Sequence, residues 1–245
     1  MLKNFTLHTE KDYEAMSQKA AEIFAAAVKA NPAGAFGFAT GSTPVGMYEA
    51  LIKMQSAGKA DLRGITAFNL DEYYPIKPDD PQSYNYFMRQ NLFDGIDFPA
   101  SSAYIPDGAA CDPIAECAAY DEKIAKAGGL DMQILGIGGN GHIGFNEPSE
   151  ELLAATSYVP LAEATIESNA RFFDSPDDVP RNALTMGIHS IMMARRIILL
   201  ASGEGKARIL REALCGPITT MVPASLLQLH RDVTVVIDEA AAKFL

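Results

Sequence analysis

The stretch AFGFATGSTP at residues 35–44 indicates the fold of this chain. Its first half is an apolar run, and its second half is a short turn of glycine, hydroxyl residues and proline. Beyond the turn, apolar side chains recur at the spacing of one helix face, at Val45, Tyr48, Leu51 and Ile52. The stretch therefore predicts a strand, a tight turn and a helix, with Thr43 as the helix cap and Pro44 in its first position.

The same order of apolar run, turn and helical stretch returns along the chain. Further apolar runs occupy residues 65–70, 132–137, 196–201 and 233–237. Strands that are apolar on nearly every residue suit a sheet covered on both faces, and the segments between them are long enough for crossover helices. We expect an α/β fold, a doubly wound and largely parallel sheet with helices on both faces, as in a Rossmann-like three-layer sandwich. Ligands of such folds bind outside the carboxyl ends of the strands.

Composition narrows the class of protein. The 245 residues suit one α/β domain, and we find no linker that would divide residues 1–245. A net charge of −11 argues against nucleic-acid binding, which needs clustered Lys and Arg. The N-terminus lacks an export signal, and no run reaches the roughly 18 apolar residues of a membrane span. Three cysteines without paired spacing are typical of a cytoplasmic protein.

Two turns resemble anion-binding helix starts. Gly41, Ser42 and Thr43 precede one helix, and Lys206 lies in the turn SGEGK at residues 202–206, before another. Unpaired N–H groups and the positive end of a helix dipole attract phosphate. A capped helix without ligand and a solvated lysine are the alternatives, but two such turns at one sheet edge favour a phosphorylated ligand.

Asp71 and Glu72 follow the apolar run at 65–70 and precede aromatic residues. Burial raises the pKa of a carboxyl group towards neutral pH, so either residue could serve as a general base. Either could equally cap the next helix. The residues themselves leave both interpretations open.

The loop LGIGGNGHIGFNEP at residues 135–148 is the most informative segment. Its five glycines allow the backbone to approach a ligand closely and to adopt positive φ. His142 and Glu147 flank a short apolar segment, so a loop that folds back can orient the imidazole against the carboxylate and give a pair that titrates near neutral pH. No second histidine or cysteine lies nearby at ligand spacing, so we expect no metal.

The segment 161–185 is polar and rich in acidic residues, with two prolines around Arg171. We expect a mobile lid that closes over a ligand and brings the Arg171 guanidinium to a phosphate. The alternative is an ordinary surface arginine.

Together these motifs resemble the glucosamine-6-phosphate deaminase family. The family patterns are A-T-G-[ST]-T-P, F-N-[LM]-D-E-Y, G-x-N-G-H-I-[AG]-F-N-E-P and S-R-F-F or a close variant, and the match extends from Gly34 to Asp238. The F-N-E-P string separates this family from the related 6-phosphogluconolactonases, whose loop resembles G-x-D-G-H-T.

The resemblance implies the roles of single residues. Asp71 would move a proton between C2 and C1 of the opened sugar as a carboxylate, and His142 would open the pyranose ring with help from Glu147. The phosphate would be held by residues from all three phosphate-binding segments, Gly41, Ser42, Thr43, Arg171 and Lys206. The implied reaction converts glucosamine 6-phosphate and water to fructose 6-phosphate and ammonia without metal or redox cofactor.

The chain departs from the family pattern in two places. Some members carry an aspartate at the position of Asn140, which can orient His142 by hydrogen bonding but adds no charge. We therefore expect Glu147 to dominate the electrostatics of His142 and the pH optimum to differ from that of the aspartate members. Ser157 and Val159 replace the arginine and lysine that bind an allosteric activator elsewhere in the family, so we expect no such activation.

Three rival functions remain at this stage. The chain could be a lactonase on the same scaffold, a deaminase of galactosamine 6-phosphate, or a sugar-phosphate sensor without activity. The F-N-E-P string disfavours the first, and the presence of Asp71, His142 and Glu147 together disfavours the last. The sequence leaves both a monomer and a homo-oligomer open.

Overall fold

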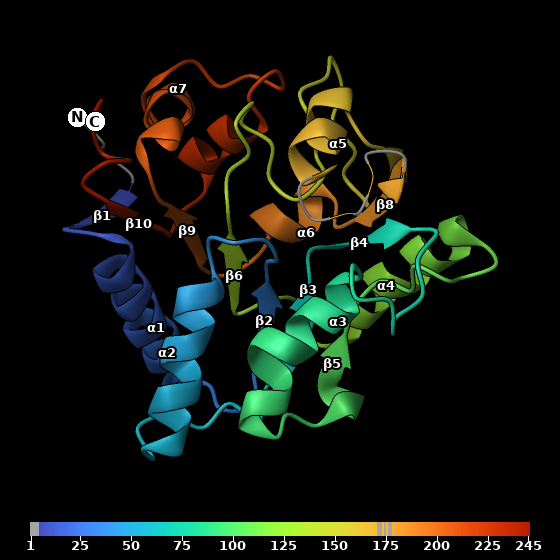
Figure 1. Ribbon diagram of the computed structural model, residues 1–245, viewed down its shortest axis with the longest axis horizontal. Helices are drawn as coiled ribbons and strands as arrows, with labels where there is room; N and C mark the ends of the chain where they lie inside the picture. Colours follow the sequence, from blue (N-terminus) through green and yellow to red (C-terminus); the bar gives the residue numbers. More distant parts are fainter. Residues whose placement is uncertain (1–4, 171–172, 174, 176–177) are drawn as a thin grey trace.

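The computed structural model describes residues 5–170, 173, 175 and 178–245. Within the described residues, seven strands form one sheet, and every neighbouring pair is parallel (Figure 1). In their order across the sheet they are β1 (Phe5–Glu10), β10 (Val233–Asp238), β9 (Ile197–Ala201), β6 (Met132–Leu135), β2 (Ala35–Phe38), β3 (Thr66–Asn69) and β5 (Ala103–Tyr104).

The predicted doubly wound parallel sheet is confirmed. The five apolar runs of the sequence are β2, β3, β6, β9 and β10, and most of their residues are buried. The two edge strands were not predicted. β1 contains only half-buried and exposed residues, and β5 has only two residues, so neither contains the continuous apolar run of a central strand.

Helices cover both faces of the sheet. Figure 1 shows α1, α2 and α3 on one side, and α6 and α7 on the other. The α-helices are α1 (Tyr13–Ala30), α2 (Val45–Ser56), α3 (Tyr84–Met88), α4 (Pro113–Lys126), α5 (Glu163–Asn169), α6 (Ile188–Met192) and α7 (Ala207–Cys215). Shorter helical turns are the π-helical η1 (Arg89–Phe93) and the 3-10 turns η2 (Asp94–Ile96), η3 (Ala100–Ser102), η6 (Glu204–Lys206) and η7 (Pro223–Leu229).

Aromatic side chains join the sheet to helix α1. Phe24 of α1 packs edge-on against Phe36 and Phe38 of β2, with ring centroids 5.2 and 5.4 Å apart. All three rings are fully buried. Burial of one such side chain contributes roughly 1.5–3 kcal/mol. This packing fixes β2, and with it the turn that follows.

A second, smaller sheet lies beside the main one and was not predicted. It contains β4 (Asp71–Tyr74), β8 (Asn182–Thr185) and β7 (Ser157–Pro160), paired antiparallel in that order. Only one residue, Leu70, separates the end of β3 from the start of β4, so the chain passes directly from one sheet to the other. The DEYY sequence of β4 carries both acidic residues on a strand.

The topology places a ligand crevice between β2 and β6. From β2 the chain proceeds to β3 and β5 on one side, and from β6 it proceeds to β9 and β10 on the other. In open parallel sheets, ligands bind outside the carboxyl ends of the strands where the order reverses in this way. The GST turn follows β2 here, and the glycine-rich loop follows β6.

Candidate active site

The turn after β2 is held by a residue from another helix. Gly41 has φ +88°, which glycine adopts without strain. The Tyr13 hydroxyl of α1 lies 3.0 Å from the Ser42 carbonyl oxygen and 3.1 Å from that of Thr43, and it accepts the Gly46 N–H at 2.9 Å. The predicted cap was wrong: α2 has no side-chain cap, and Pro44 precedes the helix. Tyr13 serves the first turn of α2 instead.

The turns after β2 and β9 share a cavity. Ser42 and Thr43 line a space of about 430 Å³ together with Tyr13, Val45 and Ser202. The sequence argument placed both turns at one sheet edge, and the structure brings them together. Ser202 and Tyr13 were not among the predicted site residues.

Asp238 at the end of β10 anchors the turn after β9. Its Oδ2 accepts the Ser202 hydroxyl at 2.5 Å, and the Gly203 N–H lies 3.0 Å from both carboxylate oxygens. Its Oδ1 also accepts the Ala241 N–H at 2.7 Å. Gly203 has φ +88°, so a glycine is required for this turn. Asp238 is buried, and no motif of the sequence pointed to it.

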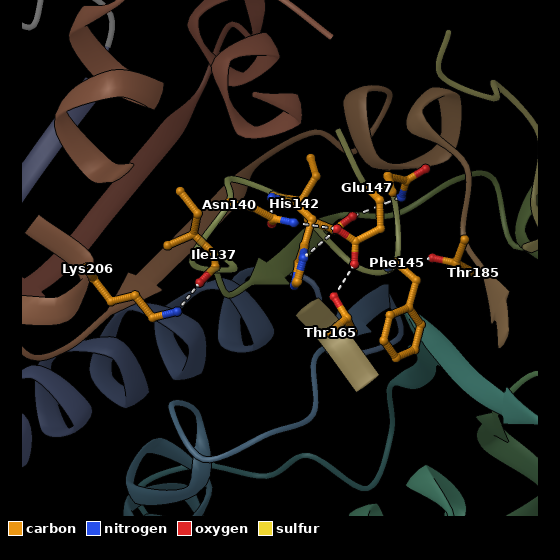
Figure 2. A network of polar contacts seen from close by, with 10 residues as sticks. Ile137, Asn140, His142, Phe145, Glu147, Thr165, Thr185 and Lys206 are labelled. Carbon is orange, nitrogen blue, oxygen red and sulfur yellow. Dashed lines mark hydrogen bonds and ion pairs between the residues drawn. The ribbon is translucent and has the colours of Figure 1, made fainter. Parts of the chain in front are cut away.

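Lys206 links the turn after β9 to the loop after β6. Its Nζ donates to the carbonyl oxygen of Ile137 at 2.7 Å, as Figure 2 shows. The charged end of this lysine therefore lies at the loop that carries His142.

Asp71 is a buried carboxyl group at the start of β4. It is 6% exposed, and no hydrogen-bond donor among the described residues reaches its carboxylate. Burial, followed by the nearby charge of Glu72, raises the pKa of Asp71 to about 8. The direction agrees with the sequence argument. The free protein favours the protonated form at neutral pH, so Asp71 has to lose this proton before it can act as the carboxylate that the resemblance implies.

Glu72 takes the role of a helix cap. Its carboxylate accepts the backbone N–H groups of Tyr73 at 2.9 Å, Tyr84 at 2.8 Å and Asn85 at 2.9 Å. The last two begin α3. Burial raises the pKa of Glu72 to about 7 against the opposing effect of these bonds. The two functions that the sequence left open are thus divided between neighbours, and Asp71 is the acid without structural hydrogen bonds.

The glycine-rich loop folds back as predicted. The Nδ1 atom of His142 lies 3.1 Å from Oε2 of Glu147 (Figure 2). The imidazole crosses closely over Gly138, where a Cβ atom would lie 2.3 Å from Nε2 of His142. A glycine is therefore required at this position. The side chains of His142 and Glu147 are 22% and 13% exposed, so the pair is partly shielded from water.

Asn140 acts on both members of the pair. Its Nδ2 donates to Oε2 of Glu147 at 2.7 Å, and its Oδ1 accepts the backbone N–H of His142 at 3.2 Å. It orients His142 through the backbone and through Glu147, with no hydrogen bond to the ring. An ionised aspartate here would have no hydrogen to donate to Glu147 and would repel it.

Glu147 has a third partner that the sequence did not reveal. The hydroxyl of Thr165, from α5, donates to Oε1 of Glu147 (Figure 2). Burial by itself raises the pKa of Glu147, but His142, Thr165 and Asn140 together lower it below its ordinary value. Glu147 is therefore a carboxylate at neutral pH.

The His142 loop packs against the start of β4. Gly144 has φ +58°, and a Cβ atom there would lie 3.5 Å from Oδ2 of Asp71 and 3.0 Å from Oγ1 of Thr185. The Phe145 N–H donates to the Thr185 hydroxyl oxygen at 3.0 Å, and Thr185 pairs with Asp71 across the second sheet. Asp71 and the loop that bears His142 are thus immediate neighbours.

Other predicted features have mixed outcomes. Arg171 lies outside the described residues. The proposed lid, 161–185, begins with α5 and ends in β8, and Ser157 and Val159 lie on β7. Among the described residues no three His, Cys, Asp or Glu side chains form a metal-binding group. No helix in the described part of the chain is long and apolar enough to span a bilayer.

Comparisons with known proteins agree over nearly the whole chain. Residues 9–236 match the family described as glucosamine-6-phosphate isomerases/6-phosphogluconolactonase. The glucosamine-6-phosphate deaminase of Halothermothrix orenii is 53% identical, over 96% of this chain and 98% of that protein. The solved structure of a monomeric glucosamine-6-phosphate deaminase is 45% identical with a TM-score of 0.95, over 98% of this chain and all (100%) of that one. The 6-phosphogluconolactonase of Trypanosoma cruzi, 22% identical with a TM-score of 0.79 over 98% and 97% of the two chains, shares the fold.

Proposed function

The chain belongs to the glucosamine-6-phosphate deaminase family, and from this premise we propose that it converts glucosamine 6-phosphate and water to fructose 6-phosphate and ammonia. One observation carries the proposal beyond family membership. A buried carboxyl group, Asp71, lies against the loop of a His142–Glu147 pair, and the turns after β2 and β9 share a cavity at the same sheet edge.

The phosphate of the substrate binds at the two turns. Ser42 and Thr43 contribute hydroxyl and backbone groups beside the cavity after β2, and Gly41 gives the turn its shape. Lys206 supplies a positive charge at the loop after β6. Arg171, which lies in the sequence between α5 and β8, completes the phosphate site. Backbone N–H groups and cationic side chains together favour a dianion over a neutral sugar.

Ring opening is the task of the pair in the glycine-rich loop. His142 takes the proton of the C1 hydroxyl and returns one to the ring oxygen. Glu147 holds the imidazole in orientation through Nδ1 and stabilises its charged form, and Asn140 holds Glu147. A histidine held in this way can act as a general acid and base.

Proton transfer between C2 and C1 falls to Asp71. The amino sugar brings an ammonium group to C2, and a positive charge beside a buried carboxyl favours its ionised form. Binding therefore converts Asp71 into the base that removes the C2 proton and returns it at C1. One proton of the ammonium group passes to O1, which leaves a hydroxyl at C1 and an iminium at C2. Water then adds at C2, ammonia leaves, and no electron is transferred to a cofactor.

The proposed setting is the cytoplasm. Cys111, Cys117 and Cys215 are all unpaired, which fits a reducing compartment.

The test is an assay of purified protein for ammonia and ketose phosphate. Glucosamine 6-phosphate, its C4 epimer and 6-phosphogluconolactone are compared, and we expect ammonia and fructose 6-phosphate from the first. Because a positioned base contributes about a hundred- to ten-thousandfold in rate, Asp71→Asn should lower kcat by that factor. The exposed neighbour variant Asp79→Asn should match the wild type. Lactone hydrolysis without ammonia release would refute the proposal.

A further inference from the structure

Glu147 is held by two separate elements of the fold. Within the glycine-rich loop, His142 and Asn140 both contact its Oε2 atom. Its other oxygen, Oε1, accepts the hydroxyl of Thr165, which lies 18 residues later on α5 (Figure 2). One carboxylate oxygen thus faces the imidazole, and the opposite oxygen faces a different helix.

Thr165 is itself firmly placed. Its side chain is 4% exposed, and the next residue, Ile166, is buried in an apolar cluster with Tyr73 and Phe145. One turn later, the Asn169 amide donates to the Tyr73 hydroxyl at 2.8 Å. These contacts of Ile166 and Asn169 help to hold α5 in place.

The last torsion angle of a glutamate side chain is soft. The terminal carboxylate rotates over a broad range unless both oxygens have fixed partners. If only Oε2 were held, the carboxylate plane could turn and weaken the contact with Nδ1 of His142. A second hydrogen bond, at Oε1, removes this freedom.

We propose that Thr165 is a positioning residue for the reaction, because its hydroxyl fixes the Glu147 carboxylate in the orientation that holds His142. The inference rests on the proposed deaminase function. It assigns to α5 a role in ring opening, in addition to its place at the beginning of the segment 161–185.

The main test compares Thr165→Val with Thr165→Ser. Valine keeps the volume and the branching of threonine but has no hydroxyl, whereas serine keeps the hydroxyl. Because a hydrogen bond to a charged group is worth about tenfold or more, we expect kcat for glucosamine 6-phosphate to fall about tenfold in Thr165→Val. Thr165→Ser should recover most of it. The control is Glu167→Gln, an exposed position of the same helix, and it should behave as wild type.

Two further readouts separate positioning from general damage. KM and the inhibition constant of inorganic phosphate should stay within about twofold in Thr165→Val, because the phosphate turns are elsewhere. His142 is the one titratable side chain that contacts Glu147 among the described residues. Loss of the Thr165 bond raises the pKa of Glu147, so the acid limb of the kcat profile should move to higher pH.

A measurement without turnover completes the design. With glutamate labelled at its carboxyl carbon and Glu147→Gln used for assignment, NMR titration reports the pKa of Glu147 directly. It should be higher in Thr165→Val and Thr165→Ala than in wild type and Thr165→Ser. If wild type releases no ammonia, the deaminase proposal fails while this titration still decides the inference. If Thr165→Val leaves both kcat and the pKa of Glu147 unchanged, the inference that Thr165 positions Glu147 is overturned. A large change in the inhibition constant of phosphate in Thr165→Val overturns it as well.

Discussion

Asp71 is a carboxyl group that tertiary contacts from several elements bury. It follows β3 at the edge of the main sheet and pairs with Thr185 in the second sheet. Gly144 of the glycine-rich loop lies next to its carboxyl group. Burial raises its pKa to about 8, so ionisation of the free protein is unfavourable at neutral pH. The same burial that prepares a base for the amino sugar therefore costs stability when no ligand is bound.

This cost gives a prediction for stability as a function of pH. The native pKa of about 8 lies above the ordinary value of 3.8, so the native state binds more protons than the unfolded state between these values. Stability from this group is complete below about pH 4 and is lost as pH rises through about 8. Asp71→Asn has no carboxyl group to ionise at this position, so it avoids this loss of stability at high pH. Its Tm should exceed that of the wild type by about 2 °C or more at pH 8.5, since about 1 kcal/mol corresponds to 2–4 °C at this size.

Thermal unfolding of both proteins at pH 5 and pH 8.5 checks this prediction. The advantage of Asp71→Asn should be larger at pH 8.5, because only the wild type has to ionise a carboxyl group at position 71. An advantage that is equal at the two pH values would show that the Asp71 carboxyl does not titrate between them.

At the scale of elements, strand ends position the turns of the site. β2 and β9 are not neighbours, because β6 lies between them, yet the turns that follow them share one cavity. Tyr13 braces the first turn from α1, and Asp238 braces the second from the end of β10. The proposed phosphate site is thus built from two turns, which α1 and the end of β10 hold in place.

The role of Asp238 yields a prediction about substrate affinity. In Asp238→Asn one acceptor oxygen becomes a donor amide, so the Ser202 hydroxyl or an N–H group of the turn loses its partner. A loosened turn should weaken phosphate binding and raise KM for glucosamine 6-phosphate about tenfold, with a smaller change in kcat. Steady-state kinetics measures both. The exposed neighbour Glu239 offers the control, Glu239→Gln, and equal KM values in the two variants would contradict the prediction.

At the scale of the whole molecule, the site collects segments from the carboxyl ends of four strands. The GST turn follows β2, Asp71 follows β3, the His142 loop follows β6, and Lys206 follows β9. A ligand that touches all of them binds only the folded chain. Its binding free energy is therefore added to the stability of the fold.

Fructose 6-phosphate should consequently raise Tm. At a concentration of about 100 times Kd it stabilises the native state by about 2.7 kcal/mol, which corresponds to about 5–10 °C for a chain of this size. Fructose without phosphate, at the same concentration, should give no shift, because the two turns bind the phosphate. Differential scanning calorimetry measures both, and equal shifts would count against a phosphate site.

The sequence by itself determined the central strands, the edge of the sheet that carries the site, and the His142–Glu147 pair. These follow from local signals: apolar runs, glycine where the backbone must bend, and partners only five residues apart. Tertiary structure alone decided the second sheet, the cap of α2 by Tyr13, the division of roles between Asp71 and Glu72, and the contact of Thr165 with Glu147. Those features join residues 12 to 114 positions apart or depend on burial. No local pattern encodes them, because they arise only when packed elements bring distant side chains together.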